Sequence, residues 1–279
     1  MRRPAAVATF RRGDVRMIGK AKRDAGLPGE RFTFEAIPDA GASEHEVNWA
    51  GGGDPATGTG RRFSTVFRSG GTHTVTATSG QDKVSFEVTV CPIDEWLTRA
   101  QLFYGPSVDF SRVRVGASRL VLGPPGTAWT CNDVIRIKRA KATADLPSES
   151  TLIHELGHVW EHQTGQVQLL RGVVEQIGRR FGRDPYDFGG PEGLRRATAL
   201  TSFTKEGQAQ ILTELWKSKH SYATDRKGVP FSTPGFDEDL ERLVAGAGIG
   251  TNRVVRRGPL SALDASIARI VNLVMGRVG

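Results

Sequence analysis

Two histidines and a glutamate stand at a spacing that is typical of a metal site on a helix. The stretch is His154-Glu155-Leu156-Gly157-His158. On an α-helix, residues four apart differ by about 40° around the axis and by about 6 Å along it, so His154 and His158 can bind one ion. Glu155, one position round, can then take a proton from a water on the metal and pass it to a leaving amine. The pattern predicts zinc-dependent hydrolysis of peptide bonds, with Glu155 as general base.

The flanking residues predict the helix that this geometry requires. Ser148 and Ser150 are suitable N-caps, and Gly165 is a suitable stop. Between them, apolar residues recur at helical spacing: Leu152, Ile153, Leu156, Val159 and Trp160. The motif is therefore expected to lie within a helix of about four turns. The alternative is a core helix whose histidines hydrogen-bond to backbone groups.

A catalytic zinc usually has three protein ligands and leaves one position for water, so a third ligand is needed. The variant with a third histidine six residues after His158 is excluded, because that position is Thr164. A glutamate on a second helix is a common third ligand. The search therefore turns to a helical glutamate further along the chain.

Residues 203–216 predict such a helix. Its apolar residues cover most of its circumference and leave a narrow polar stripe: Glu206, Gln210 and Thr213. We predict that Glu206 is the third ligand. Glu214, two turns later and rotated by about 80°, is the first alternative. His162, on the first helix, is a less favourable one because of its orientation.

A hydrolase of this kind also needs a donor for the oxyanion of its tetrahedral intermediate. Tyr186 lies in a predicted loop, residues 183–190, that precedes the second helix. His220 and Tyr222 follow that helix. We predict Tyr186 and His220 as donors, with Tyr222 as a competitor; for Tyr186, the alternative is a side chain that packs within its loop.

The chain before residue 92 has a different pattern, of short alternating segments. Strands are predicted at residues 31–36, 46–49, 62–67, 73–78 and 84–90. Glycine-rich turn segments stand at 51–55 and 70–71. The region predicts a small β-sandwich of about sixty residues. Its histidines, His45 and His73, are expected to be ordinary loop or strand residues.

These patterns predict a multidomain protein, with an all-β sandwich followed by a second domain that contains the metal helix; the family resemblances given below imply that the first is an immunoglobulin-like sandwich and the second an α+β zincin-like domain. The expected segments are a basic, flexible arm at 1–25, the sandwich at 26–92, the metallopeptidase domain at 93–250 and a C-terminal amphipathic helix within 251–279. A helix at 93–104 opens the second domain, and amphipathic helices are also predicted at 169–181 and 260–278.

The net charge of +8 is concentrated at one end of the chain. Residues 1–24 contain eight Lys or Arg and two Asp, which is +6 and leaves +2 for the remainder. The arm is therefore expected to be solvated, or to act as a docking or secretion segment. No helix-turn-helix, zinc-finger or aromatic-basic signature is present, so a nucleic-acid partner is not expected.

No stretch approaches the roughly 20 apolar residues of a membrane span, and the N-terminus lacks the apolar region of a signal peptide. We expect a protein that stays in the cytoplasm or leaves it through a specialised secretion system. Cys91 and Cys131 fit no metal-ligand spacing. They could form one disulfide or remain two buried thiols.

Three runs, at residues 110–115, 128–137 and 151–160, resemble the core domain of bacterial zincin-like metallopeptidases associated with contractile injection systems and polymorphic toxins. In that family a strand, a second strand that ends at the active-site cleft and the metal helix follow one another. The resemblance covers about residues 93 to 220. It implies a gluzincin-type site with Zn²⁺, Glu155 as general base and Glu206 at the place of the family's glutamate. Gly157 and the Glu161-His162-Gln163 run depart from the commoner pattern and leave the substrate class open.

Trp49, the glycines after it and residues 71–76 are similar to the immunoglobulin-like (PKD-like) repeats of bacterial surface and secreted enzymes. There the module binds or spaces and is not catalytic. The resemblance implies a secretion-system or surface partner, bound through the sandwich or the arm, beside a protein or peptide substrate. The alternative function is a non-catalytic structural or targeting component of a secretion or toxin system with a zinc site closed by four ligands. A third is a toxin whose substrate is not a peptide.

Overall fold

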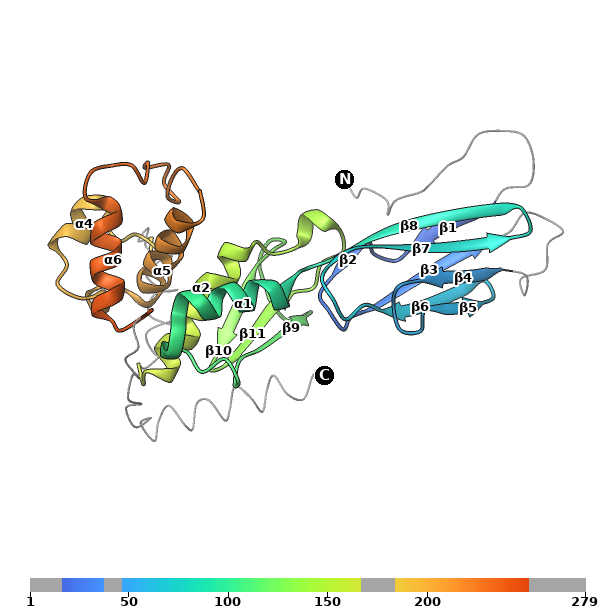
Figure 1. The fold of residues 1–279 in the computed structure, drawn as a ribbon, viewed down its shortest axis with the longest axis horizontal. Helices are drawn as coiled ribbons and strands as arrows, with labels where there is room; N and C mark the ends of the chain where they lie inside the picture. Colours follow the sequence, from blue (N-terminus) through green and yellow to red (C-terminus); the bar gives the residue numbers. More distant parts are fainter. Residues whose placement is uncertain (1–16, 38–46, 167–183, 251–279) are drawn as a thin grey trace. The chain divides into compact units, whose positions relative to one another are not determined.

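The structure is a computed structural model that describes residues 17–37, 47–166 and 184–250 (Figure 1). The chain divides into two compact units. The first, here called the β-rich unit, contains the described residues up to 96 together with 116–127 and 137–147. The second, here called the helical unit, contains 97–115, 128–136 and the described residues from 148 onward.

The β-rich unit contains two sheets. The three-stranded sheet has the order β1 (Ile18–Ala21), β3 (Arg31–Ile37), β6 (Arg62–Val66) and is antiparallel. The five-stranded sheet has the order β2 (Ala25–Gly26), β8 (Asp82–Val90), β7 (Gly71–Ser79), β4 (Asn48–Gly51), β5 (Thr57–Thr59). Within it β2 pairs parallel to β8, and the other pairs are antiparallel.

One apolar core takes side chains from both sheets, because alternate residues of each strand turn to the same face. Phe34 of β3 lies against Trp49 of β4 and Phe86 of β8, with ring centroids 6.2 Å and 5.2 Å away. All three rings are buried. Aromatic burial of this kind is the main source of stability in a small β unit.

Each of the five predicted strands overlaps a strand of the structure, although the one predicted at 46–49 shares only residues 48–49 with β4. Three others, β1, β2 and β5, were not predicted because they have two to four residues and little apolar alternation. β1 and the first residue of β2 lie within the segment 1–25 that was expected to be an arm, and β1 pairs with β3, for example Lys20 opposite Glu35.

Five α-helices lie within the described residues, and all of them follow β8 in the chain: α1 (Ile93–Tyr104), α2 (Glu149–Gln163), α4 (Gly190–Arg196), α5 (Lys205–Lys219) and α6 (Phe236–Gly246). The same part of the chain contains a three-stranded sheet. Its order is β10 (Ala128–Cys131), β11 (Val134–Lys138), β9 (Arg114–Ser118). Strand β10 therefore lies at an edge of this sheet. This later part of the chain is α+β. No helix of the described part has the length and apolar character to cross a membrane.

The predicted helices at 93–104, around the histidine motif and at 203–216 are confirmed as α1, α2 and α5. The run 128–137, expected as one strand, forms two strands that turn at Asn132, whose φ of 56° lies in the left-handed region. Helices α4 and α6 were not predicted. The predicted helices at 169–181 and 260–278, the C-terminal segment 251–279, His45 and residues 1–16 of the arm lie outside the described residues.

Cys91 and Cys131 are both buried free thiols, so they form no disulfide. Burial raises the pKa of the Cys91 thiol to about 12 and also raises the pKa of Cys131. His73 is a strand residue, as expected, and its ring stacks on Phe67 with centroids 4.3 Å apart.

Candidate metal centre

Helix α2 carries both histidines and is fixed at several points along its length. Ser148 is the N-cap, and its hydroxyl accepts a hydrogen bond from the Thr151 N–H at 3.2 Å. Arg99 of α1 binds both carboxylate oxygens of Glu149, at 2.7 Å and 2.8 Å. The buried Tyr104 hydroxyl donates to the carbonyl of Ile153 at 2.8 Å, directly before His154. These contacts set the position of the histidine face.

Helix α5 brings Glu206 to that face. Thr204 is its N-cap and accepts from the Gly207 N–H at 3.0 Å, which places Glu206 in the first turn. The two helices pack closely at Gly157, where an added Cβ would lie 3.0 Å from the Cα of Ala209. Glycine at position 157 therefore suits the close approach of a helix backbone rather than a turn.

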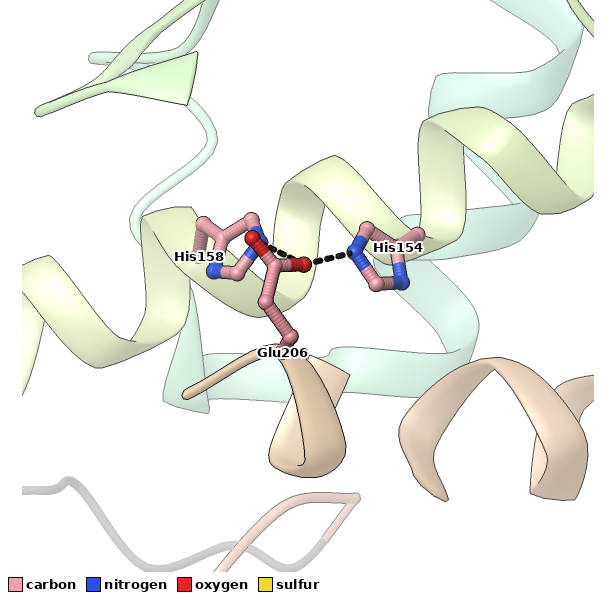
Figure 2. Close-up of side chains that lie close together, drawn as sticks. All are labelled: His154, His158 and Glu206. Carbon is pink, nitrogen blue, oxygen red and sulfur yellow. Dashed lines mark hydrogen bonds and ion pairs between the residues drawn. The ribbon is translucent and has the colours of Figure 1, made fainter. Parts of the chain in front are cut away.

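The side chains of His154, His158 and Glu206 point toward one another from these two helices (Figure 2). The Nε2 atom of His154 lies 3.0 Å from Glu206 Oε2, and the Nε2 atom of His158 lies 3.4 Å from the same oxygen. All three potential ligand atoms lie within 4.8 Å of one another. The side chains are 13 to 18% exposed, so the group is mostly buried and still in part accessible to solvent. Such a group could hold a metal ion.

The pKa values of Glu206 and His158 follow from the short contacts among these side chains. Burial alone would raise the pKa of Glu206, but its hydrogen bonds with His154 and His158 hold that pKa well below its ordinary value. Burial alone would lower the pKa of His158, but its hydrogen bonds with Glu161 and Glu206 raise that pKa well above its ordinary value. The site therefore favours a positive charge between the carboxylates, which is a property that a metal cation would also satisfy.

Glu161 is a residue that the sequence patterns did not assign to the site in this role. Its side chain is fully buried, and its Oε2 lies 3.0 Å from Nδ1 of His158. A carboxylate on the second ring nitrogen fixes the tautomer and orientation of a histidine ligand, leaving Nε2 for the metal. The sequence did contain a signal for this contact: Glu161 follows His158 by three residues, and side chains at that spacing on a helix can meet.

Glu155 is buried and lies on the same helix. The hydroxyl of Thr130, on the edge strand β10, donates to Glu155 Oε2 at 2.6 Å. This hydrogen bond fixes one carboxylate oxygen of the predicted general base. Thr130 was part of the run that carried the family resemblance, but no role had been predicted for it.

Tyr186 lies beside the group: its ring centroid is 5.6 Å from that of His154. His220 does not. It is the C-cap of α5, about 20 Å along the helix axis from Glu206, and its ring stacks on Trp216 with centroids 4.1 Å apart. Tyr222 also packs near Trp216, at 6.0 Å. The structure thus brings Tyr186, and neither His220 nor Tyr222, to the histidine motif.

Glu214, the alternative ligand, lies about 12 Å along α5 from Glu206. It is fully buried, and it accepts hydrogen bonds from the side chain of Gln210 and from the Arg226 N–H, the latter at 3.1 Å. Burial raises its pKa. Among the described residues, the group that could hold a metal ion contains Glu206 and includes neither Glu214 nor His162.

No model of a known protein family matches the chain, and a search of curated proteins finds no match to it.

Proposed function

We propose that the chain is a zinc-dependent endopeptidase in which His154, His158 and Glu206 hold the metal. The observation that carries the proposal is the convergence of these three donors, from two helices, on one point. Two imidazoles and one carboxylate suit zinc, and a set of three protein ligands is typical of catalytic rather than structural sites.

Bound zinc would supply a Lewis acid that lowers the pKa of water to about 7. Glu155 is the general base. Because the Thr130 hydroxyl donates to Oε2, we assign the proton of the attacking water to Oε1, from which it passes to the leaving amine. Tyr186, beside His154, is the donor proposed for the oxyanion.

A peptide substrate is supported by the position of β10. This strand is at the edge of its sheet, and Thr130 within it contacts the general base. An extended peptide can add to such an edge through backbone hydrogen bonds. We propose that the substrate binds along β10, which would place its backbone beside Glu155.

For the β-rich unit we propose an immunoglobulin-like sandwich that binds or spaces. The support is one apolar core shared by two mainly antiparallel sheets. A surface or secretion-system partner would bind through this unit or through the basic segment 1–16, whose five arginines and one aspartate give +4 of the net charge. No nucleic-acid partner is proposed.

Metal content and hydrolysis of fluorescein-labelled casein test the proposed function. The wild-type protein should contain stoichiometric zinc and cleave casein. His154→Ala should lose both. Glu155→Gln should keep the zinc and lose hydrolysis, since the amide cannot accept the proton. Casein cleavage by the glutamine variant at the wild-type rate would refute the mechanism.

The alternative, a non-catalytic structural or targeting component, makes a different prediction for the same zinc. A structural site is normally closed by four protein ligands. X-ray absorption of the zinc-loaded protein should therefore show three protein ligands and one water-derived oxygen if the site is catalytic. Four protein ligands would favour the structural role.

A further inference from the structure

Tyr186 contacts a second group besides His154. The guanidinium carbon of Arg226 lies 4.9 Å from the centroid of the Tyr186 ring, a distance typical of a cation–π contact. Arg226 comes from the loop that follows α5, forty residues after Tyr186 in the chain. The loop thus supplies a cation to the ring that lies beside the metal centre.

Asp184 links the two segments. Its Oδ2 pairs with Nη1 of Arg226 at 2.9 Å, and its Oδ1 accepts from the backbone N–H of Tyr186 at 3.1 Å. One carboxylate therefore binds both the backbone that carries the ring and the guanidinium that covers it. Arginine suits this arrangement, because its planar head can stack on a ring while its edge donates to a carboxylate.

The backbone at Arg226 is itself anchored to α5. Its N–H donates to Glu214 Oε1, which is fully buried. The neighbouring Asp225 accepts from the N–H groups of Lys227 and Val229, both at 2.8 Å, and this closes the turn. Glu214 thus fixes the start of the turn from which Arg226 extends.

The other side of the Tyr186 segment is anchored to the same helix. The Thr204 hydroxyl, which caps α5 two residues before Glu206, donates to the carbonyl of Pro185 at 2.5 Å. The segment is therefore held to α5 at its cap and, through Arg226, at Glu214. The helix that carries the proposed ligand Glu206 also sets the place of the tyrosine.

We propose that Arg226 is a positioning residue, which holds the Tyr186 ring beside His154 and acts on the reaction through that tyrosine alone. The expected effect of Arg226 on hydrolysis rests on the proposed function, whereas its effect on the position of the Tyr186 ring does not. The two can therefore be tested separately.

The position of the ring can be followed by fluorine NMR of protein labelled with 3-fluorotyrosine. The chain has three tyrosines: Tyr104, Tyr186 and Tyr222. Tyr186→Phe assigns the resonance of interest, and the buried Tyr104 reports whether the fold is intact. The metal-free protein can be used, so the readout needs no activity.

Arg226→Met should move the Tyr186 resonance toward that of free 3-fluorotyrosine and leave the Tyr104 resonance in place. Arg196→Met is the matched control, since it removes an arginine of the same unit whose pair with Glu192 is exposed. An unchanged Tyr186 resonance in Arg226→Met would overturn the proposal. If Arg226→Met shifts Tyr104 as well, Asp184→Asn replaces it, with the same expected shift and the same overturning result.

Casein hydrolysis by the zinc-loaded variants gives the second readout. Removing an oxyanion donor costs about 100-fold or more in kcat, so displacing one should cost less, about 10-fold. We expect that loss in kcat for Arg226→Met, with KM and zinc affinity near the wild-type values. A change in KM with unaltered kcat would contradict positioning of the donor. If wild type cleaves no casein, the proposed function fails, while the fluorine spectra still decide the role of Arg226.

Discussion

In the β-rich unit the buried carboxylate of Glu30 is met by two arginines, whereas in the helical unit the carboxylate of Glu206 is met by two histidines. Glu30 Oε1 lies 2.7 Å from Arg23 and 2.6 Å from Arg139. Burial would raise the pKa of Glu30, but the Leu27 N–H and the two arginines lower it. Both carboxylates are thus stabilised as anions between two nitrogen groups.

The two clusters differ in whether their nitrogen groups can lose a proton. A guanidinium keeps its proton at any pH that a protein survives, so the Glu30 cluster is a closed ion network. An imidazole can release its proton and present a lone pair, so the Glu206 cluster can exchange a proton for a metal cation. The Glu30 cluster can stabilise the fold, whereas the Glu206 cluster can bind either a proton or a metal cation.

The buried side chains of the two units also differ in polarity. The β-rich unit buries mainly aromatic and aliphatic side chains, while α2 and α5 also bury polar ones, including Glu155, Glu161, Gln208, Gln210 and Glu214. Burying a polar group costs free energy unless it is bonded. The following variants test whether this cost is concentrated where the metal would bind. Those at the metal centre come in order of decreasing effect on zinc affinity, and those in the β-rich unit serve as comparisons.

The largest effect is expected from Glu206→Ala. It removes one of three proposed ligands, so stoichiometric zinc should be lost while the fold survives, because the two imidazoles it leaves can be neutral. Zinc retained after gel filtration, measured by mass spectrometry, and the urea midpoint check the two parts. Wild-type zinc content in this variant would remove Glu206 from the site.

The matched change in the β-rich unit is Glu30→Ala. It should leave zinc affinity unaltered and lower the free energy of unfolding by about 3–5 kcal/mol, because two arginines lose their shared partner. A loss of zinc here would break the contrast between the two clusters. An unchanged urea midpoint would show that Glu30 does not stabilise the fold.

A smaller effect on zinc is expected from Glu161→Gln. The amide keeps the size of the side chain but weakens the hold on His158 Nδ1, and losses of this kind lower metal affinity by about 10- to 100-fold. Competition with a coloured chelator measures the change. Glu149→Gln, on the same helix but paired with Arg99, should leave zinc affinity unchanged. Equal affinities in the two variants would contradict the orienting role of Glu161.

A still smaller effect is expected from Gly157→Ala. The new Cβ would meet the Cα of Ala209 at 3.0 Å, and a backbone atom cannot turn aside, so α2 and α5 must separate slightly. Overpacking costs about 1–3 kcal/mol, and its lower end corresponds to roughly fivefold in zinc affinity. Gly246→Ala, where the added Cβ meets nothing within 4 Å, is the control. Unaltered zinc affinity in Gly157→Ala would show that the helix spacing does not control the site.

The parts of the site that could be predicted from the sequence depend on local spacing. His154 and His158 share a helix face, and Glu206 stands on the polar stripe of a second, nearly buried helix. Both are periodic signals that tertiary structure does not alter. The strands around Phe34 and Phe86 were predicted for the same reason, since their alternation is long enough to read.

What could not be predicted depends on contacts between segments far apart in the chain. Thr130 meets Glu155, and Arg226 meets Tyr186, only because the fold brings remote segments together. Helix α4 contains two glycines and one proline in seven residues, so its helix propensity is weak. Helix α6 is different: its buried Phe236, Leu240, Leu243 and Val244 follow a helical period that was available in the sequence.

Phe34→Ala, in the aromatic core of the β-rich unit, is expected to leave zinc affinity unaltered, as is Glu30→Ala. Its ring packs between Trp49 and Phe86, so the cavity should lower the free energy of unfolding by about 3–5 kcal/mol. Below the unfolding transition, zinc affinity should equal that of wild type, because Phe34 and the two histidines belong to different compact units, and independent sites have additive effects. Chelator competition and urea unfolding, on the same sample, measure both quantities. A lower zinc affinity in the fully folded variant would mean that the two units are energetically coupled. The aromatic core of the β-rich unit would then affect the metal centre as well as stability.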